Sequence, residues 1–163
     1  MNSPDTALYE AVRASRLAAE LDDDQTAVLA GLMTLETFAP KQVLSREGSA
    51  DNHLYVIVSG SLAVIKNFGT PDETPLVTLQ PGDFAHELGF LDGTERYASM
   101  VAATESKVLV FERSKLERLI ETDPLILYRV MCAIVRTAHR IQARQSMQAA
   151  ELTNYVFKTH GRY

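Results

Sequence analysis

The chain has 163 residues, one cysteine and a formal net charge of −5 at pH 7. This length suits one compact domain with room for a helical appendage. An acidic chain disfavours a nucleic-acid-binding surface, which is normally basic. Because Cys132 has no second cysteine with which to form an internal disulfide, we expect a reducing, cytoplasmic location. The N-terminal sequence lacks the pattern of a secretory signal, and no apolar run is long enough to predict a membrane span.

Residues 1–36 are predicted to form an N-terminal helical segment. Apolar residues recur there at near-helical spacing, namely Leu8, Val12, Leu17 and Leu21. The three aspartates at 22–24 break this first helix, and any of them could cap a second helix that extends to about residue 32.

Residues 37–122 are predicted to form short antiparallel strands. The clearest strand-like segments are 54–59, 62–66, 76–79, 98–102 and 107–111. Turn residues separate such segments about every 8–12 residues, a rhythm typical of an antiparallel sandwich or barrel. A short helix should close this region, with Ser114 and Glu117 forming its capping box.

Residues 123–163 are predicted to form a long C-terminal helix and a tail. Asp123 is the expected N-cap and Pro124 the first helical residue, and the helix should run to about Tyr155. A heptad-like seam follows its length: Leu127, Met131, Ile134, Ala138, Ile141, Gln145, Gln148, Leu152 and Tyr155. This seam predicts a homodimer formed through the helix over 123–155. The alternative is one wide apolar stripe packed within a single domain.

A basic row on the same helix is interpreted as a solvated face rather than a nucleic-acid site. Its members are Arg129, Arg136, His139, Arg140 and Arg144.

The candidate functional residues are Glu87 and Arg96, which lie nine positions apart across a glycine-containing turn. A guanidinium can bond two phosphate oxygens at once, and a carboxylate can accept hydrogen bonds from sugar hydroxyls. The pair therefore suits a small ligand that carries both groups. The alternative is a structural ion pair between Glu87 and Arg96.

His86 directly precedes Glu87, and histidine beside a carboxylate is one feature of metal sites. The only other histidine in the β region is His53, and no His-x-His pair exists. We therefore predict no metal site. We also expect no cofactor and no catalytic residue, and a chain that is not an enzyme. A cupin-like metalloenzyme remains the less favoured alternative.

Several motifs, in order, resemble one known family. They are VLSREGS (43–49), LYVIVSG (54–60), PGDF (81–84), ELG (87–89) and RYAS (96–99). The run from 38 to 127 resembles the cyclic nucleotide-binding domain found in catabolite activator protein and in regulatory subunits of cAMP-dependent protein kinase. The resemblance implies a mainly β fold with flanking helices, a β-roll or jelly-roll of about eight antiparallel strands. It also implies a phosphate-binding cassette at 81–102, with the long helix closing over the ligand.

The resemblance further implies roles by position, with cAMP or cGMP as the ligand. Arg96 would bind the cyclic phosphate, Glu87 would bind the ribose 2′-hydroxyl, and His86 and Gly89 would line the pocket. Backbone groups near three residues would complete the phosphate site, namely Leu88, Tyr97 and Ala98. The base would contact the long helix at Ile141 and Gln142.

Two departures from the family pattern concern ligand binding. His86 stands where the family usually has glycine, and Tyr97 stands where it usually has alanine, serine or threonine.

The expected function is a sensor that acts on an unknown effector protein through a conformational change. Since no helix-turn-helix domain follows the long helix, direct DNA binding is not expected. The alternative is a degenerate fold with an empty pocket that serves as a protein-interaction scaffold.

Overall fold

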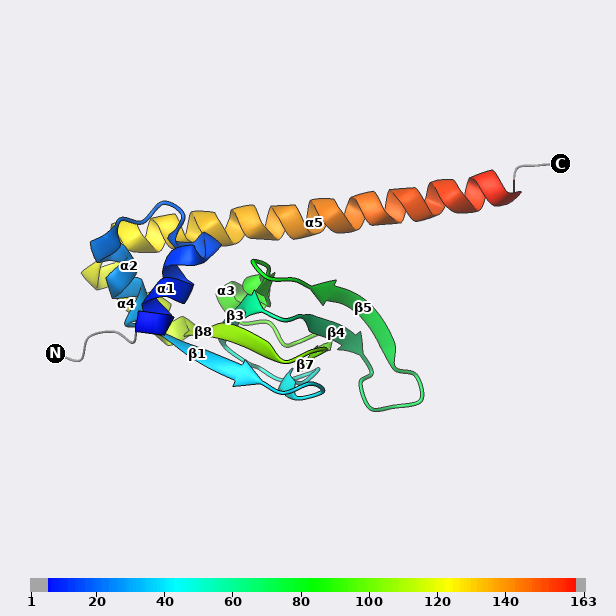
Figure 1. The fold of residues 1–163 in the computed structure, drawn as a ribbon, viewed down its shortest axis with the longest axis horizontal. Helices are drawn as coiled ribbons and strands as arrows, with labels where there is room; N and C mark the ends of the chain where they lie inside the picture. Colours follow the sequence, from blue (N-terminus) through cyan, green and yellow to red (C-terminus); the bar gives the residue numbers. More distant parts are fainter. Residues whose placement is uncertain (1–5, 161–163) are drawn as a thin grey trace.

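Two antiparallel sheets form a β-roll, and one long helix lies across it (Figure 1). The structure is a computed structural model that describes residues 6–160, so residues 1–5 and 161–163 of the predicted terminal segments lie outside the described part. The predicted fold class, mainly β with about eight antiparallel strands and flanking helices, is confirmed.

Each sheet contains four strands. The first has the order β1 (Met33–Phe38), β8 (Ser106–Glu112), β3 (His53–Ser59) and β6 (Phe84–Ala85). The second has the order β2 (Val43–Ser45), β7 (Ser99–Ala102), β4 (Leu62–Lys66) and β5 (Thr74–Leu79). Between β6 and β7 lies the short helix α3 (Glu87–Asp92).

Strand β3 is buried on both faces because it separates two layers of the core. Tyr55 and Ile57 pack between the two sheets. Leu54 and Val56, which alternate with them, pack against the helices on the other face. This period of two is the ordinary geometry of a strand, and it explains the unbroken apolar run that predicted β3.

The N-terminal segment contains α1 (Thr6–Ala14), the 3₁₀ helix η1 (Arg16–Ala18) and α2 (Asp23–Ala30). Asp22 is the aspartate that caps α2, because its carboxylate accepts the Gln25 N–H at 2.8 Å and the Gln25 side chain accepts the Asp22 N–H. The predicted helical boundary at residue 36 is wrong. Residues from Met33 onward pair with β8 as β1, from Met33 opposite Phe111 to Phe38 opposite Ser106.

Helices α4 (Arg113–Thr122) and α5 (Pro124–His160) follow β8. The predicted capping box of α4 is wrong, because Glu112 holds the N-cap position and Ser114 donates to its carboxylate at 2.5 Å. Helix α5 begins at Pro124 as predicted but continues past Tyr155 to His160.

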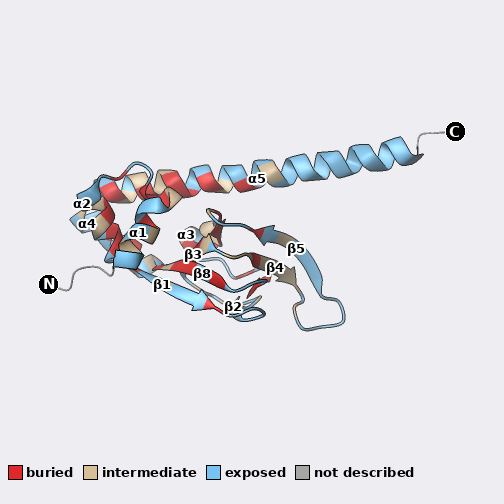
Figure 2. Ribbon diagram, in the orientation of Figure 1, coloured by how far each residue is buried: buried red, intermediate tan, exposed pale blue. Residues whose placement is uncertain are grey.

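The two halves of α5 differ in their surroundings, as Figure 2 shows. The first half is packed: Ile134 is buried, and Leu127 and Met131 pack against the same core, which is shared with the N-terminal helices and the first sheet. The second half is exposed to its end. The first half of the predicted seam is therefore used within the chain, as the single-domain alternative expected. Within residues 6–160, no helix is both long and apolar enough to cross a membrane.

Candidate functional site

A cavity of about 670 Å³ lies between one end of the β-roll and α5. This volume falls within the range of small-molecule sites. Every residue predicted from the sequence for the site lines it: His86, Glu87, Leu88, Gly89, Arg96, Tyr97, Ala98, Ile141 and Gln142. The structure thus brings the cassette and the long helix together around one hollow, and the ligand roles of these residues stay predictions.

Arg96 is the buried cation of the cavity wall, and only 5% of its surface is exposed. Its Nη2 donates to Asp51 Oδ2 at 2.8 Å and to the His53 carbonyl at 3.1 Å. The guanidinium also lies over the Tyr55 ring, 5.5 Å from its centre. Its Nε is buried and has no hydrogen-bond partner within the described residues. The side chain is therefore held in place while its buried Nε donor remains unused.

Asp51 is the counterion that sequence reasoning missed. Its carboxylate accepts hydrogen bonds from Tyr55 Oη at 2.8 Å and from the His53 N–H at 3.0 Å, and His53 Nδ1 lies 2.6 Å away. Burial alone would raise the pKa of Asp51, but these hydrogen bonds and the charge of Arg96 hold it below its ordinary value. Asp51 is therefore ionised near neutral pH and fixes the guanidinium.

Glu87 begins α3 and faces the same cavity without neutralising Arg96. Within residues 6–160 the carboxylate paired with Arg96 is Asp51, so the predicted alternative of a Glu87–Arg96 ion pair does not hold. Burial, followed by the charge of Asp83, raises the pKa of Glu87. A partly desolvated carboxylate of this kind gains from hydrogen-bond donors, which a ligand hydroxyl supplies.

His86 keeps the backbone conformation expected of the glycine that it replaces. Its φ is 65° and its ψ is 30°, in the left-handed region that histidine tolerates better than most residues. The ring is accommodated by Gly89, because a Cβ at that position would lie 2.2 Å from both Cε1 and Nε2 of His86. The departure from the family pattern is therefore offset by a second glycine one turn later, and the cavity stays open.

Tyr97 lies on the wall of the cavity with 66% of its surface exposed. Its carbonyl accepts a hydrogen bond from Lys66 Nζ at 2.9 Å, and Lys66 also pairs with Glu47. Burial, followed by the negative charge of Glu87, raises the pKa of the Tyr97 hydroxyl. The backbone is therefore anchored, and the ring borders the hollow without filling it.

Helix α5 supplies the other wall. Besides Ile141 and Gln142, its cavity-lining residues include His139 and Gln145. The sequence pattern predicts His139 on the solvated row and Gln145 in the dimer seam. A helix that lies along the edge of a cavity presents residues from adjacent turns, and the heptad pattern alone does not distinguish such a wall from an intermolecular seam.

The basic row on α5 is only partly a solvated face, which corrects the prediction. Arg129 donates to the Gln25 side chain at 2.8 Å, Arg136 pairs with Glu20, and Arg144 bonds Asp83. These three arginines hold α5 against the N-terminal segment and the β-roll.

The described side chains do not form a set of metal ligands. Within residues 6–160, no group of three or more histidine, cysteine, aspartate or glutamate side chains is arranged to hold a metal ion. The cupin-like alternative therefore has no structural observation to support it.

Comparison with known proteins agrees with this geometry. Residues 35–123 match the cyclic nucleotide-binding domain family. The cAMP-activated global transcriptional regulator CRP of Escherichia coli O157:H7 is 35% identical over 103 residues, which are 63% of this chain and 49% of that protein. The chain thus spans about half the length of the first curated relatives that it matches.

Two solved structures show the same fold. A cyclic nucleotide-binding domain from Methylobacillus flagellatus superimposes with a TM-score of 0.77 at 19% identity, covering 91% of this chain and 84% of the other. The regulatory domain of Toxoplasma gondii PKA, crystallised with cAMP, superimposes with a TM-score of 0.65 at 20% identity, covering 83% of this chain and 49% of the other. The family match extends over more than half of the sequence, and the chain belongs to the cyclic nucleotide-binding domain family.

Proposed function

We propose that this chain is a sensor that binds a cyclic nucleotide, cAMP or cGMP, in the cavity between the β-roll and α5. The observation that carries the proposal is the buried Arg96 guanidinium, oriented by Asp51, with its Nε unpaired, on the same cavity wall as Glu87. A buried cation with an unused donor suits the cyclic phosphate, because charge-assisted hydrogen bonds are the strong ones.

The remaining roles follow from the positions of the residues around Arg96. Glu87 accepts the ribose 2′-hydroxyl, and backbone N–H groups near Leu88, Tyr97 and Ala98 complete the phosphate site. The base lies toward α5, where Ile141 supplies an apolar contact and Gln142 a hydrogen-bonding edge. An apolar wall with a few placed polar groups is the usual character of such a site.

The output is a conformational change read by a partner protein. Since α5 forms one wall of the cavity, a ligand that contacts it binds the closed arrangement more tightly and shifts the population toward it. A homodimer formed through the exposed half of α5 would carry this change to a second copy. The acidic net charge favours a protein effector over direct contact with DNA, and the single cysteine suits the cytoplasm.

Isothermal titration calorimetry with cAMP and cGMP tests the binding step. We expect saturable binding that weakens at least about tenfold in Arg96→Gln, because a hydrogen bond to a charged group contributes about 1.5–3 kcal/mol. Arg140→Gln, which removes the same charge from an exposed position on α5, is the matched control. Circular dichroism shows whether Arg96→Gln is folded, and Glu87→Gln provides a second, nearly isosteric variant.

One observation favours the scaffold alternative. Asp51 already neutralises Arg96 in the absence of ligand, as an ion pair in a disused pocket would. The same titration separates the two functions. If wild-type protein gives neither heat nor thermal shift with millimolar cAMP or cGMP, the chain is an interaction scaffold and the sensor proposal is wrong.

A further inference from the structure

Asp83 joins the cassette to the long helix. It lies in the turn before β6, and only 5% of its side chain is exposed. Its Oδ2 accepts Arg144 Nη2 at 2.7 Å, and its Oδ1 lies 3.3 Å from Arg144 Nη1. Oδ2 also accepts the Gln80 N–H at 2.9 Å. Such a two-pronged contact between a guanidinium and a carboxylate is directional as well as charge-assisted.

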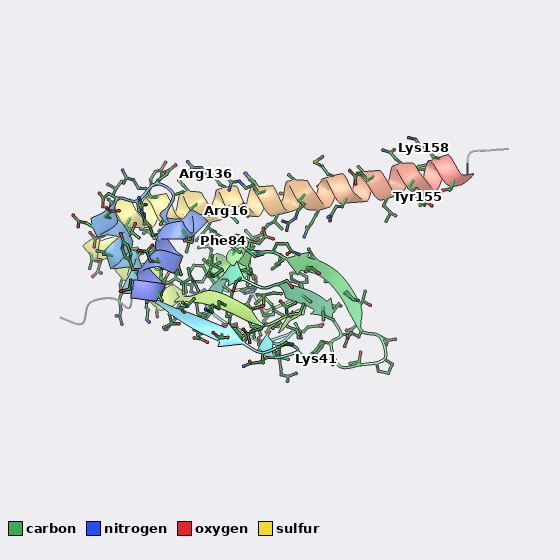
Figure 3. The ribbon with its side chains drawn as sticks, in the orientation of Figure 1. Arg16, Lys41, Phe84, Arg136, Tyr155 and Lys158 are labelled. Atoms are coloured by element: carbon green, nitrogen blue, oxygen red, sulfur yellow. The ribbon has the colours of Figure 1, made fainter. Side chains whose placement is uncertain are left out.

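A second arginine approaches the same carboxylate from the N-terminal segment. Arg16, in η1, donates to the Gly82 carbonyl at 3.0 Å, and its Nη1 lies 3.9 Å from Asp83 Oδ1. Figure 3 shows Arg16 just below α5. Three segments that are distant in the sequence, η1, the cassette and α5, therefore meet at one buried carboxylate.

Arg144 lies where the packed part of α5 ends and its exposed part begins. The last α5 residue that lines the ligand cavity is Gln145. Every residue from Gln145 to Thr159 is exposed. Arg144 is thus the last partly buried residue of α5 within the described chain. Beyond it, about six turns of packed and cavity-lining contacts give way to an exposed helical end. On its other side Arg144 borders a second hollow beside β5.

We propose that the Asp83–Arg144 pair is a latch that holds α5 over the ligand cavity and ties the position of α5 to the cassette. Removing Arg144 leaves Asp83 buried with Arg16 as its more distant cation, and a buried carboxylate without a close partner is unfavourable. The latch therefore stabilises the closed position of α5 in the ligand-free chain. Breaking the Asp83–Arg144 pair would release α5, so the pair acts as a switch between two positions of the helix.

Amide hydrogen exchange of the ligand-free chain tests the latch. In Arg144→Gln and in Asp83→Asn, we expect exchange of the 138–145 and 82–92 segments to speed up at least about fivefold, a modest figure because Arg144 is partly exposed. Exchange in β3 and β8 should not change, and the double variant should be no faster than the faster single variant. Arg140→Gln, one turn earlier on α5, is the control and should behave as wild type.

Three results would overturn the latch: unchanged exchange in Arg144→Gln, equal acceleration throughout the chain, or additive effects in the double variant.

Calorimetry with cAMP and 2′-deoxy-cAMP then separates the latch from the proposed function. If α5 loosens but neither nucleotide binds wild-type protein, the latch stands and the proposed function fails. If cAMP binds and α5 exchange is unaffected by either substitution, the latch fails and the proposed function stands.

Discussion

Arg96 donates to Asp51 at 2.8 Å, so the cation proposed for the phosphate already has an anionic partner within the chain. The pair is largely buried, because 4% of the Arg96 side chain and 14% of the Asp51 side chain are exposed. Asp51 orients the guanidinium, and an incoming phosphate would share it. The same arrangement stabilises the empty site and prepares it for an anion.

Asp51→Asn should destabilise the ligand-free chain and enhance the stabilising effect of a ligand. Loss of the counterion leaves Arg96 buried and unpaired, which we expect to lower the free energy of unfolding by about 2–4 kcal/mol. A cyclic phosphate supplies the missing charge, so saturating cAMP should raise the melting temperature more in the variant than in wild type. Asp72→Asn, in the exposed loop between β4 and β5, is the control. Equal stabilisation of both proteins by cAMP would show that the phosphate does not reach Arg96.

Glu87 should make the stability of the chain fall as pH rises. Burial and then the charge of Asp83 raise its pKa above the ordinary 4.5, so the folded chain retains a proton that the unfolded chain has released. The stability that this proton contributes is complete below 4.5 and is lost as pH rises through the raised value. Across that interval, urea unfolding should show wild type losing stability relative to Glu87→Gln. Glu121→Gln, on the exposed face of α4, should follow wild type.

Ligand affinity should change with pH in the opposite direction. A ribose hydroxyl donates best to ionised Glu87, so cAMP affinity should rise as pH increases through the raised pKa of Glu87. Titrations with 2′-deoxy-cAMP, which lacks the hydroxyl, should show a flatter profile. A parallel rise for both nucleotides would assign the pH dependence to another group.

The predicted strands were those with strong local patterns. Strand β4 matches its predicted bounds, and β3 begins one residue earlier than predicted, because their apolar and β-branched runs are long. Strands β2 and β6 contain three and two residues, too few to show a period. The local sequence does not separate β1 from the helical segment before it, because its partner, β8, lies some seventy residues later.

The same limit applies to the site. The cassette was predictable because its residues are close in sequence and match a family pattern. Asp51 lies 45 positions from Arg96, and Asp83 lies 61 positions from Arg144. Neither pairing follows from spacing, because each depends on how the β2–β3 loop or α5 packs on the folded roll. Buried polar partners of this kind are set by tertiary structure rather than by local propensity.

His86 and Gly89 should be coupled. In wild type, Gly89→Ala places a Cβ 2.2 Å from the His86 ring, so the ring or α3 must shift and the chain should lose stability. A His86→Gly background removes the three atoms nearest to that Cβ. Alanine is favoured over glycine within a helix by about 0.5–1 kcal/mol. Urea unfolding of the two single variants and the double variant should therefore show Gly89→Ala changing sign. Additive effects would mean that the ring moves aside without cost.

The exposed end of α5 provides the test of the homodimer. In Figure 3, Tyr155 and Lys158 lie on opposite sides of this end of α5. Leu152 and Tyr155 lie on the predicted seam and are 65% and 68% exposed in the single chain. Burying each against a second copy would contribute about 1.5–3 kcal/mol, whereas a glutamate placed there would have to be desolvated.

Leu152→Glu should therefore convert a dimer into a monomer. We expect the dissociation constant from analytical ultracentrifugation to rise at least about 100-fold, since loss of the apolar contact and burial of a charge act together. Ala150→Glu adds the same charge at an exposed position off the seam and should leave the dimer intact. Because the first half of the seam is packed within the chain, Ile134→Glu should instead unfold the monomer. A wild-type protein that sediments as a monomer at micromolar concentration would leave the free end of α5 without a role in self-association.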